Sequence, residues 1–204
     1  MHDPLLESIM SGPLRDRMLI SFDTEFVDTG TSVELISIGL VRADGRELYL
    51  ENADFPDRGG HLVDDWMEAH VMEKTFLRTA PDDERILPHG EIGARVRDFM
   101  LEGGKAPSLW AHYASYDFLA FSHLFGRMLD IPDGLPRHCM DFRVLQDLTG
   151  IKPPSQDKAN AHHALVDARW GKRAFAAFGM EFERFDPARD LELPEPSRQL
   201  CCEM

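Results

Sequence analysis

The stretch MLISFDTEFVDTGTSVELISIGLVRADGRELYLEN, residues 18–52, decides the fold of this chain. Its first part, Met18 to Phe26, is apolar and rich in β-formers, which is typical of a central strand covered on both faces. A turn at residues 28–30 leads into a second strand, Ser32 to Arg42, and the Asp44-Gly45 pair predicts a hairpin turn into a third strand, ELYLEN. Three strands joined by short turns imply an antiparallel meander.

The rest of the chain alternates helical and strand-like segments, with an irregular stretch from Pro56 to Pro88. We expect helices at residues 63–76, 91–101, 116–129, directly before Gly150 and at 161–178, and short strands at 107–112 and 138–140. Ser115 is a candidate N-cap, and Gly150 is a candidate C-cap. Because strands separated by helices usually pair in parallel, this order predicts an α/β fold with a mixed five-stranded sheet flanked by helices.

Length and composition predict one globular domain. The chain has 204 residues and 43% hydrophobic content, enough for one substantial core. We expect an N-terminal arm at residues 1–17, a domain at 18–178 and a C-terminal tail at 179–204. No window holds the ~20 apolar residues of a membrane span, and the N-terminus lacks the apolar run of a signal peptide. Cys139, Cys201 and Cys202 form neither an even disulfide framework nor a zinc pattern, which fits the reducing cytoplasm.

The net charge is −14, which argues against tight binding of long duplex nucleic acid. Such binding gains most of its affinity from Lys and Arg side chains that neutralise phosphates. Carboxylates that bind divalent cations nevertheless reverse the field that a phosphate meets locally. The composition therefore suits a short or single-stranded substrate that is held at one end.

Three separate carboxylates follow or end predicted strands. Asp23 and Glu25 stand two apart near the end of the first strand, so alternation directs both side chains to one face. Asp117 follows the buried strand PSLWAH and lies in the first turn of the next helix. Each feature alone has an ordinary explanation, a solvated strand end or an acid at a helix start.

A histidine and an aspartate are paired in the segment AHHALVDAR, residues 161–169. His162 and Asp167 are five residues apart, which corresponds to about 140° of helix rotation, so both cannot face one point from inside a helix. We therefore expect His162 in the preceding loop or first turn, with Asp167 on the helix. The small residues Ala164, Ala168 and Gly171 would let that helix lie close to the sheet and bring Asp167 near Asp23. His163 is a rival candidate for the same role.

The order of these motifs resembles the DEDDh 3′-to-5′ exonucleases, which have a ribonuclease H-like fold. The resemblance runs from Met18 to about Phe175. Within that superfamily, the segments SFDTEFVDTGTSVELISIGLV, LWAHYASYDFLAFSHLFG and HHALVDAR look most like ribonuclease AS, the polyadenylate-specific 3′-exoribonuclease. The segment WMEAHV, around Trp66 and His70, also resembles that family.

The resemblance implies roles for the acidic residues and for one histidine. Asp23, Glu25, Asp117 and Asp167 would hold two Mg²⁺ or Mn²⁺ ions, and His162 would be the general base. Hard cations prefer oxygen ligands, two such ions can promote an in-line displacement, and a histidine near neutrality can accept the proton of water. The expected reaction is hydrolysis of single-stranded RNA from its 3′ end, with a preference for adenylate. The resemblance also suggests a homodimer.

Substrate contacts are expected from residues beside these motifs, namely Thr24, Phe26, Tyr113, Tyr116, Trp66 and His70. Two of them depart from the wider superfamily. Tyr113 stands where related enzymes usually carry Asn, and Phe26 stands where many carry Thr. An aromatic ring at either position could stack on a terminal base.

Alternative functions use the same residues differently. A DNA exonuclease of the proofreading type would have the same carboxylates, because these motifs do not read the sugar. A non-catalytic nucleic-acid-binding module would lack one of the carboxylates, and none is missing here. A small-molecule phosphodiesterase is a further alternative.

Overall fold

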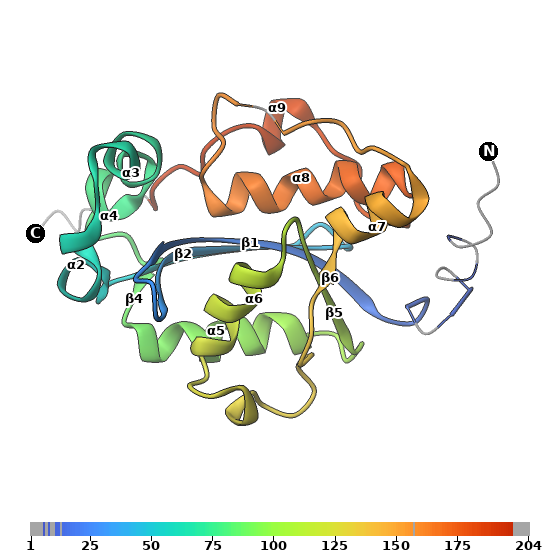
Figure 1. Ribbon diagram of the computed structural model, residues 1–204, viewed down its shortest axis with the longest axis horizontal. Coiled ribbons are helices and arrows are strands. Elements are labelled where there is room, and N and C mark those ends of the chain that lie inside the picture. Colours follow the sequence, from blue (N-terminus) through green and yellow to red (C-terminus); the bar gives the residue numbers. More distant parts are fainter. Residues whose placement is uncertain (1–5, 7, 9–10, 13, 157, 198–204) are drawn as a thin grey trace, which may run out of the picture.

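The computed structural model describes residues 6, 8, 11–12, 14–156 and 158–197, and their strands form a single mixed sheet (Figure 1). The strand order is β4-β3-β2-β1-β5-β6. The antiparallel meander predicted from residues 18–52 is confirmed, since β2 pairs antiparallel with both β1 and β3. The other pairings, β1 with β5, β5 with β6 and β3 with β4, are parallel. The strands are β1 (Met18–Asp28), β2 (Val33–Arg42), β3 (Glu47–Asn52), β4 (Ile86–Leu87), β5 (Pro107–Ala111) and β6 (Met140–Asp141).

The sheet has six strands rather than the expected five. The additional strand, β4, contains only two residues and lies in the irregular stretch after β3. A strand of two residues has no alternating pattern, so periodicity could not reveal it. The mixed sheet with flanking helices is otherwise as predicted, and it is consistent with a ribonuclease H-like fold.

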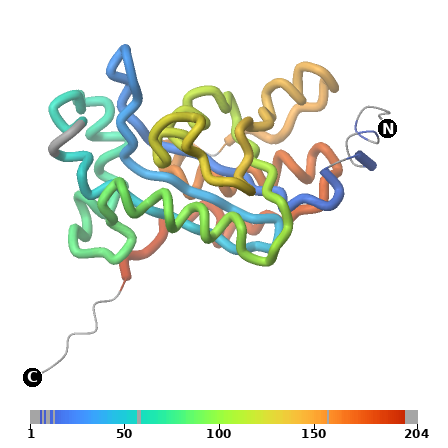
Figure 2. The backbone as a smooth tube through the Cα atoms, turned by 90° about the horizontal axis from the view of Figure 1, so that it is seen from below, coloured from blue at the N-terminus to red at the C-terminus, as the bar shows by residue number. Residues whose placement is uncertain are grey.

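Helices cover both faces of the sheet (Figure 1). One face carries α5 (His89–Leu101) and α6 (Ser115–His123), and Figure 2 shows α5, in green, running across it. The opposite face carries α7 (Phe142–Thr149) and α8 (Ala164–Ala177). This double coverage explains why β1 and β2 are buried along most of their length. Within the described part of the chain, no helix is both long enough and apolar enough to span a membrane.

The helix expected at residues 63–76 is instead several short turns. These are α3 (Asp65–His70), a 3₁₀ turn at Met72–Lys74 and α4 (Phe76–Thr79), preceded by α2 (Phe55–Arg58) and a 3₁₀ turn at Gly60–Leu62. The break at Thr75 has a long-range cause. The buried carboxylate of Glu51, on β3, accepts hydrogen bonds from the amides of Phe76 and Leu77 at 2.7 and 2.8 Å. These two hydrogen bonds cap the first turn of α4 and so begin a new helix there. Because Glu51 is distant in sequence, the spacing of apolar residues within 63–76 could not predict this break.

Other helix boundaries also differ from the prediction. The helix expected to reach residue 129 ends at His123, and Gly126 with φ +98° separates it from a 3₁₀ turn at Met128–Asp130. Ser115 is inside α6 rather than at its N-cap, which is Ala114. The last strand lies at Met140–Asp141 rather than 138–140. The left-handed C-cap at Gly150, with φ +71°, is confirmed.

Two glycines allow α8 to lie directly on the sheet, as the small residues of that segment suggested. A Cβ at Gly39 of β2 would lie 2.4 Å from the carbonyl oxygen of Ala164, at the start of α8. A Cβ at Gly171 of α8 would lie 1.9 Å from Oγ of Ser21, on β1. Since both distances are far below van der Waals contact, only glycine permits this spacing at either position.

The chain beyond residue 178 packs against α8 as far as residue 197. The ammonium of Lys172, on α8, is fully buried and contacts the carboxylates of Glu183 at 2.7 Å and Asp190 at 3.1 Å. Arg169 donates to the carbonyl oxygen of Glu192. The short helix α9 (Pro187–Asp190) belongs to this segment. The predicted tail therefore lies along the helix that carries Asp167, up to its last seven residues, 198–204, which fall outside the described residues.

The predicted N-terminal arm falls partly outside the described residues. Of residues 1–17, the structure describes 6, 8, 11–12 and 14–17. Arg17 donates to the carbonyl oxygen of Pro107 at 3.3 Å, next to the first residue pair of β1 and β5.

Gly171→Ala should destabilise the protein by about 1–3 kcal/mol, because the added methyl group forces α8 away from Ser21. Gly90→Ala is the matched control, since a Cβ at that helical position meets nothing within 4 Å. The control should be neutral or slightly stabilising. Thermal unfolding by circular dichroism should show a melting temperature that is lower by about 2–10 °C for Gly171→Ala only. Equal melting temperatures for the two variants would contradict this account of helix packing.

Candidate active site

Carboxylates from three elements converge where β1 emerges between α6 and α8. Asp23 and Glu25 come from β1 and Asp167 comes from α8, and each offers an oxygen within 4.8 Å of the others. Asp117, in the first turn of α6, is buried beside them and contributes to raising the pKa of both Asp23 and Glu25. The structure thus brings together all four acidic residues that the sequence analysis selected.

Thr24 fixes the position of Asp117. Its backbone amide and its hydroxyl both donate to Oδ1 of Asp117, at 2.9 and 2.7 Å. Because strand alternation directs the side chain of Thr24 to the face opposite Asp23 and Glu25, one strand supplies two carboxylates and also anchors a third. Thr24, expected among the substrate contacts, is itself buried.

His162 precedes α8, as its spacing from Asp167 required. Its backbone has φ +64°, and its amide donates to Oδ2 of Asp167 at 2.8 Å. Its ring meets Trp66 of α3 edge to face, with the ring centroids 5.0 Å apart. Burial, followed by the charges of Lys74 and His70, lowers the pKa of His162. The imidazole is therefore held in its neutral form near neutral pH.

The rival histidine, His163, lies in the core instead. Its ring is 2% exposed and stacks on Tyr49 with the centroids 4.5 Å apart. Neither of its ring nitrogens has a hydrogen-bond partner among the described residues, and burial lowers its pKa to about 3. This placement favours His162 as the residue available for chemistry.

The carboxylates raise one another's pKa. For Asp23, burial and then the charges of Asp117, Asp167 and Glu25 raise the pKa well above its usual value. Burial and the same kind of repulsion raise the pKa of Glu25 well above normal, with Lys74 opposing. Burial also raises the pKa of Asp117 and of Asp167 to about 6, against hydrogen bonds that favour the charged forms. In the absence of cations, this cluster holds protons that ordinary carboxylates release.

This donor set fits divalent metal ions. It offers only hard oxygen ligands, which Mg²⁺ and Mn²⁺ prefer, and it concentrates negative charge that cations would neutralise. Among the causes of the four shifts, Lys74 is the one cation that lowers any of them.

Lys74 is a functional candidate that sequence reasoning did not find. It ends the 3₁₀ turn after α3, and its ammonium donates to the carbonyl oxygen of Ala161, the residue before His162. Its charge lowers the pKa of Glu25, Asp167 and His162. No motif marks this lysine, because it reaches the site from the irregular region through tertiary packing.

Exposed aromatic side chains flank the carboxylates on two sides. On one side, Trp66 stacks on His70 at 4.7 Å, and Trp66 also contacts His162. On the other side, Tyr116 stacks on Phe26 at 5.8 Å, next in sequence to Asp117 and Glu25 respectively. The remaining expected contact, Tyr113, is 60% exposed in the loop between β5 and α6.

Comparison with known proteins places these residues in one matched region. The chain matches the family described as the 3′-5′ exoribonuclease Rv2179c-like domain over residues 18–178. It is similar to two proteins of Mycobacterium tuberculosis, 3′-5′ exoribonuclease Rv2179c of strain ATCC 25618 / H37Rv and 3′-5′ exoribonuclease MT2234.1 of strain CDC 1551 / Oshkosh. Each is 34% identical over 156 residues, which cover 76% of this chain and 89% of the relative.

Asp23→Asn should have opposite effects on stability without and with metal. In EDTA at about pH 8, it should stabilise the protein by ~1–2 kcal/mol, because it removes one charge from a repelling cluster. Raised pKa values in the folded state mean that the wild-type carboxylates contribute stability at low pH and lose it as pH rises through about 6. The advantage of the variant should therefore shrink as pH falls through about 6 and vanish only below about pH 4, the ordinary pKa of an aspartate.

With Mn²⁺ at about pH 8, the order should reverse, because the wild-type protein binds the ion more tightly. Asp98→Asn, at an exposed aspartate paired with Arg97, is the matched control and should respond to neither condition. Differential scanning fluorimetry over this pH range measures both effects. A loss of stability for Asp23→Asn in EDTA at about pH 8 would contradict the repulsion described here.

Proposed function

Because the chain belongs to the Rv2179c-like 3′-5′ exoribonuclease family, and is thus a hydrolase acting on RNA, we propose that it works by a two-metal DEDDh mechanism. Asp23, Glu25, Asp117 and Asp167 hold two Mg²⁺ or Mn²⁺ ions, and His162 is the general base. The observation that carries this proposal is that Asp23 and Glu25 of β1 and Asp167 of α8 place oxygens within 4.8 Å of one another, with Asp117 of α6 buried beside them. Bound ions would activate the attacking water and stabilise charge on the leaving 3′ oxygen.

His162 is suited to accept the proton of the attacking water. Its lowered pKa keeps the imidazole unprotonated at neutral pH, so it can act as a base. The backbone amide of His162 donates a hydrogen bond to Asp167, and Lys74 donates one to the carbonyl oxygen of Ala161. These two hydrogen bonds restrain the backbone on both sides of the His162 side chain. The edge contact with Trp66 restrains the ring itself. A base that is already oriented loses little entropy when the reaction begins.

Lys74 would give the metal-loaded site a net positive charge, which favours binding of a phosphate. Two divalent ions would neutralise the four carboxylates, and the ammonium of Lys74 would then leave one net positive charge. A cation within reach of Glu25 and Asp167 is placed to attract the scissile phosphate of an acidic polymer to an acidic protein. We assign Lys74 to this electrostatic role.

Single-stranded RNA with a free 3′ end, with adenylate preferred, is the proposed substrate. The Trp66–His70 and Phe26–Tyr116 pairs offer aromatic rings near the carboxylates on which the terminal bases can stack. The acidic surface offers little grip on distant phosphates, so binding is concentrated in the last few nucleotides. The adenylate preference is what the resemblance to ribonuclease AS implies. A homodimer in the cytoplasm is the setting that we expect.

A set of labelled substrates tests the proposal. Oligo-A, oligo-U and oligo-dA of equal length are incubated with Mg²⁺ or Mn²⁺, together with oligo-A carrying a 3′ phosphate and with circular RNA. We expect stepwise shortening from the 3′ end, with oligo-A fastest and the blocked and circular substrates resistant, because the site has to accept a free 3′ terminus. Cleavage of the circle would exclude the end requirement, and faster loss of oligo-dA would favour a DNA exonuclease.

His162→Ala should reduce kcat by roughly 10² to 10⁴, the range expected for loss of a general base. The stabilisation by Mn²⁺ should be retained, because the carboxylates are unchanged. His163→Phe is the matched control: it keeps a ring beside Tyr49 and removes two buried nitrogens that lack partners. The control should keep its activity and its melting temperature. An inactive but stable His163→Phe, together with an active His162→Ala, would reverse the assignment.

A further inference from the structure

Tyr113 has a strained backbone at the edge of the proposed active site. Its φ is +60°, a left-handed conformation that is costly for a bulky residue. Among the residues that the structure describes, His162 is the only other non-glycine residue with positive φ. Backbone strain of this kind concentrates at functional sites. His162 has a proposed catalytic role, and we therefore ask what role Tyr113 has.

The carboxylate of Asp141 holds Tyr113 in this conformation. Its two oxygens accept the amides of Tyr113 at 3.2 Å and of Ala114 at 3.1 Å. The same carboxylate caps α7 by accepting the amide of Arg143 at 2.7 Å. One side chain thus ties the loop before α6 to the start of α7 and fixes Tyr113 relative to Arg143.

The ring of Tyr113 contacts the side chains of His112 and Arg143. His112 lies against it with the centroids 4.4 Å apart, and His112 in turn lies 5.0 Å from Trp170 of the core. Arg143 donates from Nη1 to the hydroxyl of Tyr113 at 3.2 Å. Despite these contacts the tyrosine is 60% exposed. The guanidinium carbon of Arg143 lies over the ring, 5.8 Å from its centroid. An exposed ring next to a guanidinium can stack on a base while the guanidinium binds a backbone phosphate.

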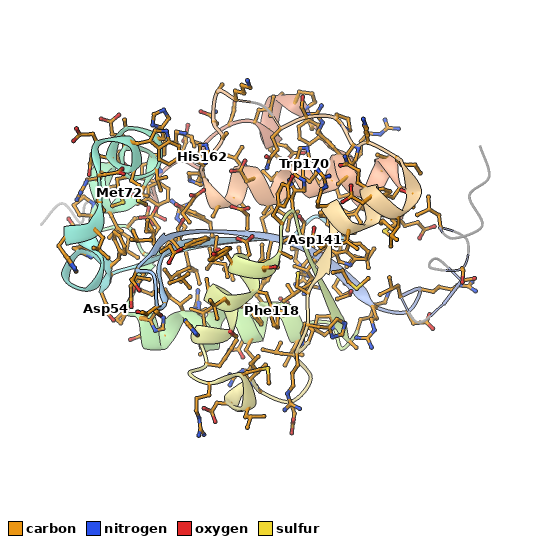
Figure 3. The ribbon with its side chains drawn as sticks, viewed as in Figure 1. Asp54, Met72, Phe118, Asp141, His162 and Trp170 are labelled. Atoms are coloured by element: carbon orange, nitrogen blue, oxygen red, sulfur yellow. The ribbon has the colours of Figure 1, made fainter. Side chains whose placement is uncertain are left out.

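The location of Tyr113 and Arg143 relative to His162 indicates which part of the RNA they would contact. His162 contacts Trp66 of α3, whereas Asp141 ends β6 and caps α7, and the two residues lie apart in Figure 3. Tyr113 directly precedes Ala114, the N-cap of α6, and Asp117 is in the first turn of that helix, so Tyr113 and Arg143 lie near the carboxylates. In an in-line displacement the leaving group departs opposite the attacking water. The strand upstream of the scissile bond should therefore leave on the side away from His162.

We propose that Tyr113 and Arg143 form a subsite for the RNA upstream of the scissile phosphate, with the tyrosine ring stacking on a base and the guanidinium binding a backbone phosphate. This inference rests on the proposed function, since it places the leaving strand of that reaction. Arg143 pairs with Asp147 at 2.9 Å, but both side chains are exposed, so a phosphate can replace the aspartate at little cost.

The test compares substrates with and without an upstream strand. One is a five-nucleotide oligo-A, and the other is the 5′-p-nitrophenyl ester of AMP, which has a leaving group but no upstream nucleotide. The measured quantity is the ratio of kcat/KM on the pentamer to kcat/KM on the ester. Tyr113→Ala should lower this ratio by about 5- to 100-fold, the range for loss of one stacked base. Tyr113→Phe keeps the ring and should largely retain the ratio.

Arg143→Ala should lower the same ratio and also change its salt dependence. Losing one phosphate contact on a single strand should reduce the slope of log(kcat/KM) against log[salt] for the pentamer by about 0.7. Arg127→Ala, which removes another exposed arginine paired with an aspartate, is the matched control and should leave the slope and ratio unchanged. Asp147→Asn should raise the ratio, because it releases Arg143 from its competitor.

Binding of fluorescent pentamer to the His162→Ala protein gives a readout that does not depend on turnover. Adding Tyr113→Ala should weaken this binding by about 5- to 100-fold, and adding Arg143→Ala should also weaken it. If the wild-type protein hydrolyses neither substrate, the proposed function fails, yet the binding comparison still judges the subsite. Two results would overturn the proposed subsite: an equal loss of kcat/KM on the pentamer and on the ester, or pentamer binding that is unchanged in both variants.

Discussion

Buried carboxylates that lie close together repel one another strongly unless cations neutralise them. Asp23, Glu25 and Asp167 place oxygens within 4.8 Å of one another, with Asp117 buried beside them. The cluster is assembled from β1, α6 and α8, so no single element has to carry the full repulsion. Thr24 holds Asp117, and the amide of His162 holds Asp167. Gly39 and Gly171 let α8 lie close enough to the sheet for Asp167 to approach Asp23 and Glu25. Folding energy from the core keeps together groups that would separate in water.

The sequence could predict the parts of the fold and site that depend on local pattern. The meander of residues 18–52 followed from hydrophobicity and turn residues, and the DxE motif on it pointed both carboxylates to one face. The spacing of His162 and Asp167 required the histidine to precede α8, and it does. The preference for His162 over the neighbouring His163 came from resemblance alone. The burial of His163 against Tyr49 adds a physical reason.

The remaining features depend on contacts between distant residues. Glu51 starts α4 by capping amides from across the fold, which broke the helix expected at residues 63–76. That rearrangement brings Lys74 to the carboxylates and Trp66 to His162. Likewise, Asp141 fixes Tyr113 beside Arg143, two residues that are 30 apart in sequence. The acidic net charge gave no sign that Lys74, Arg143 and these rings would lie near the carboxylates.

We propose that the four carboxylates are charged together when divalent cations bind among them. Anomalous scattering from crystals grown with Mn²⁺ tests this claim most directly, because it locates the metal independently of any activity. The account predicts strong anomalous peaks among Asp23, Glu25 and Asp167, with Asp117 beside them, and their loss in Asp23→Asn crystals. Crystals at saturating Mn²⁺ and about pH 8 with no peak at the cluster, or with the carboxylates facing apart, would contradict it.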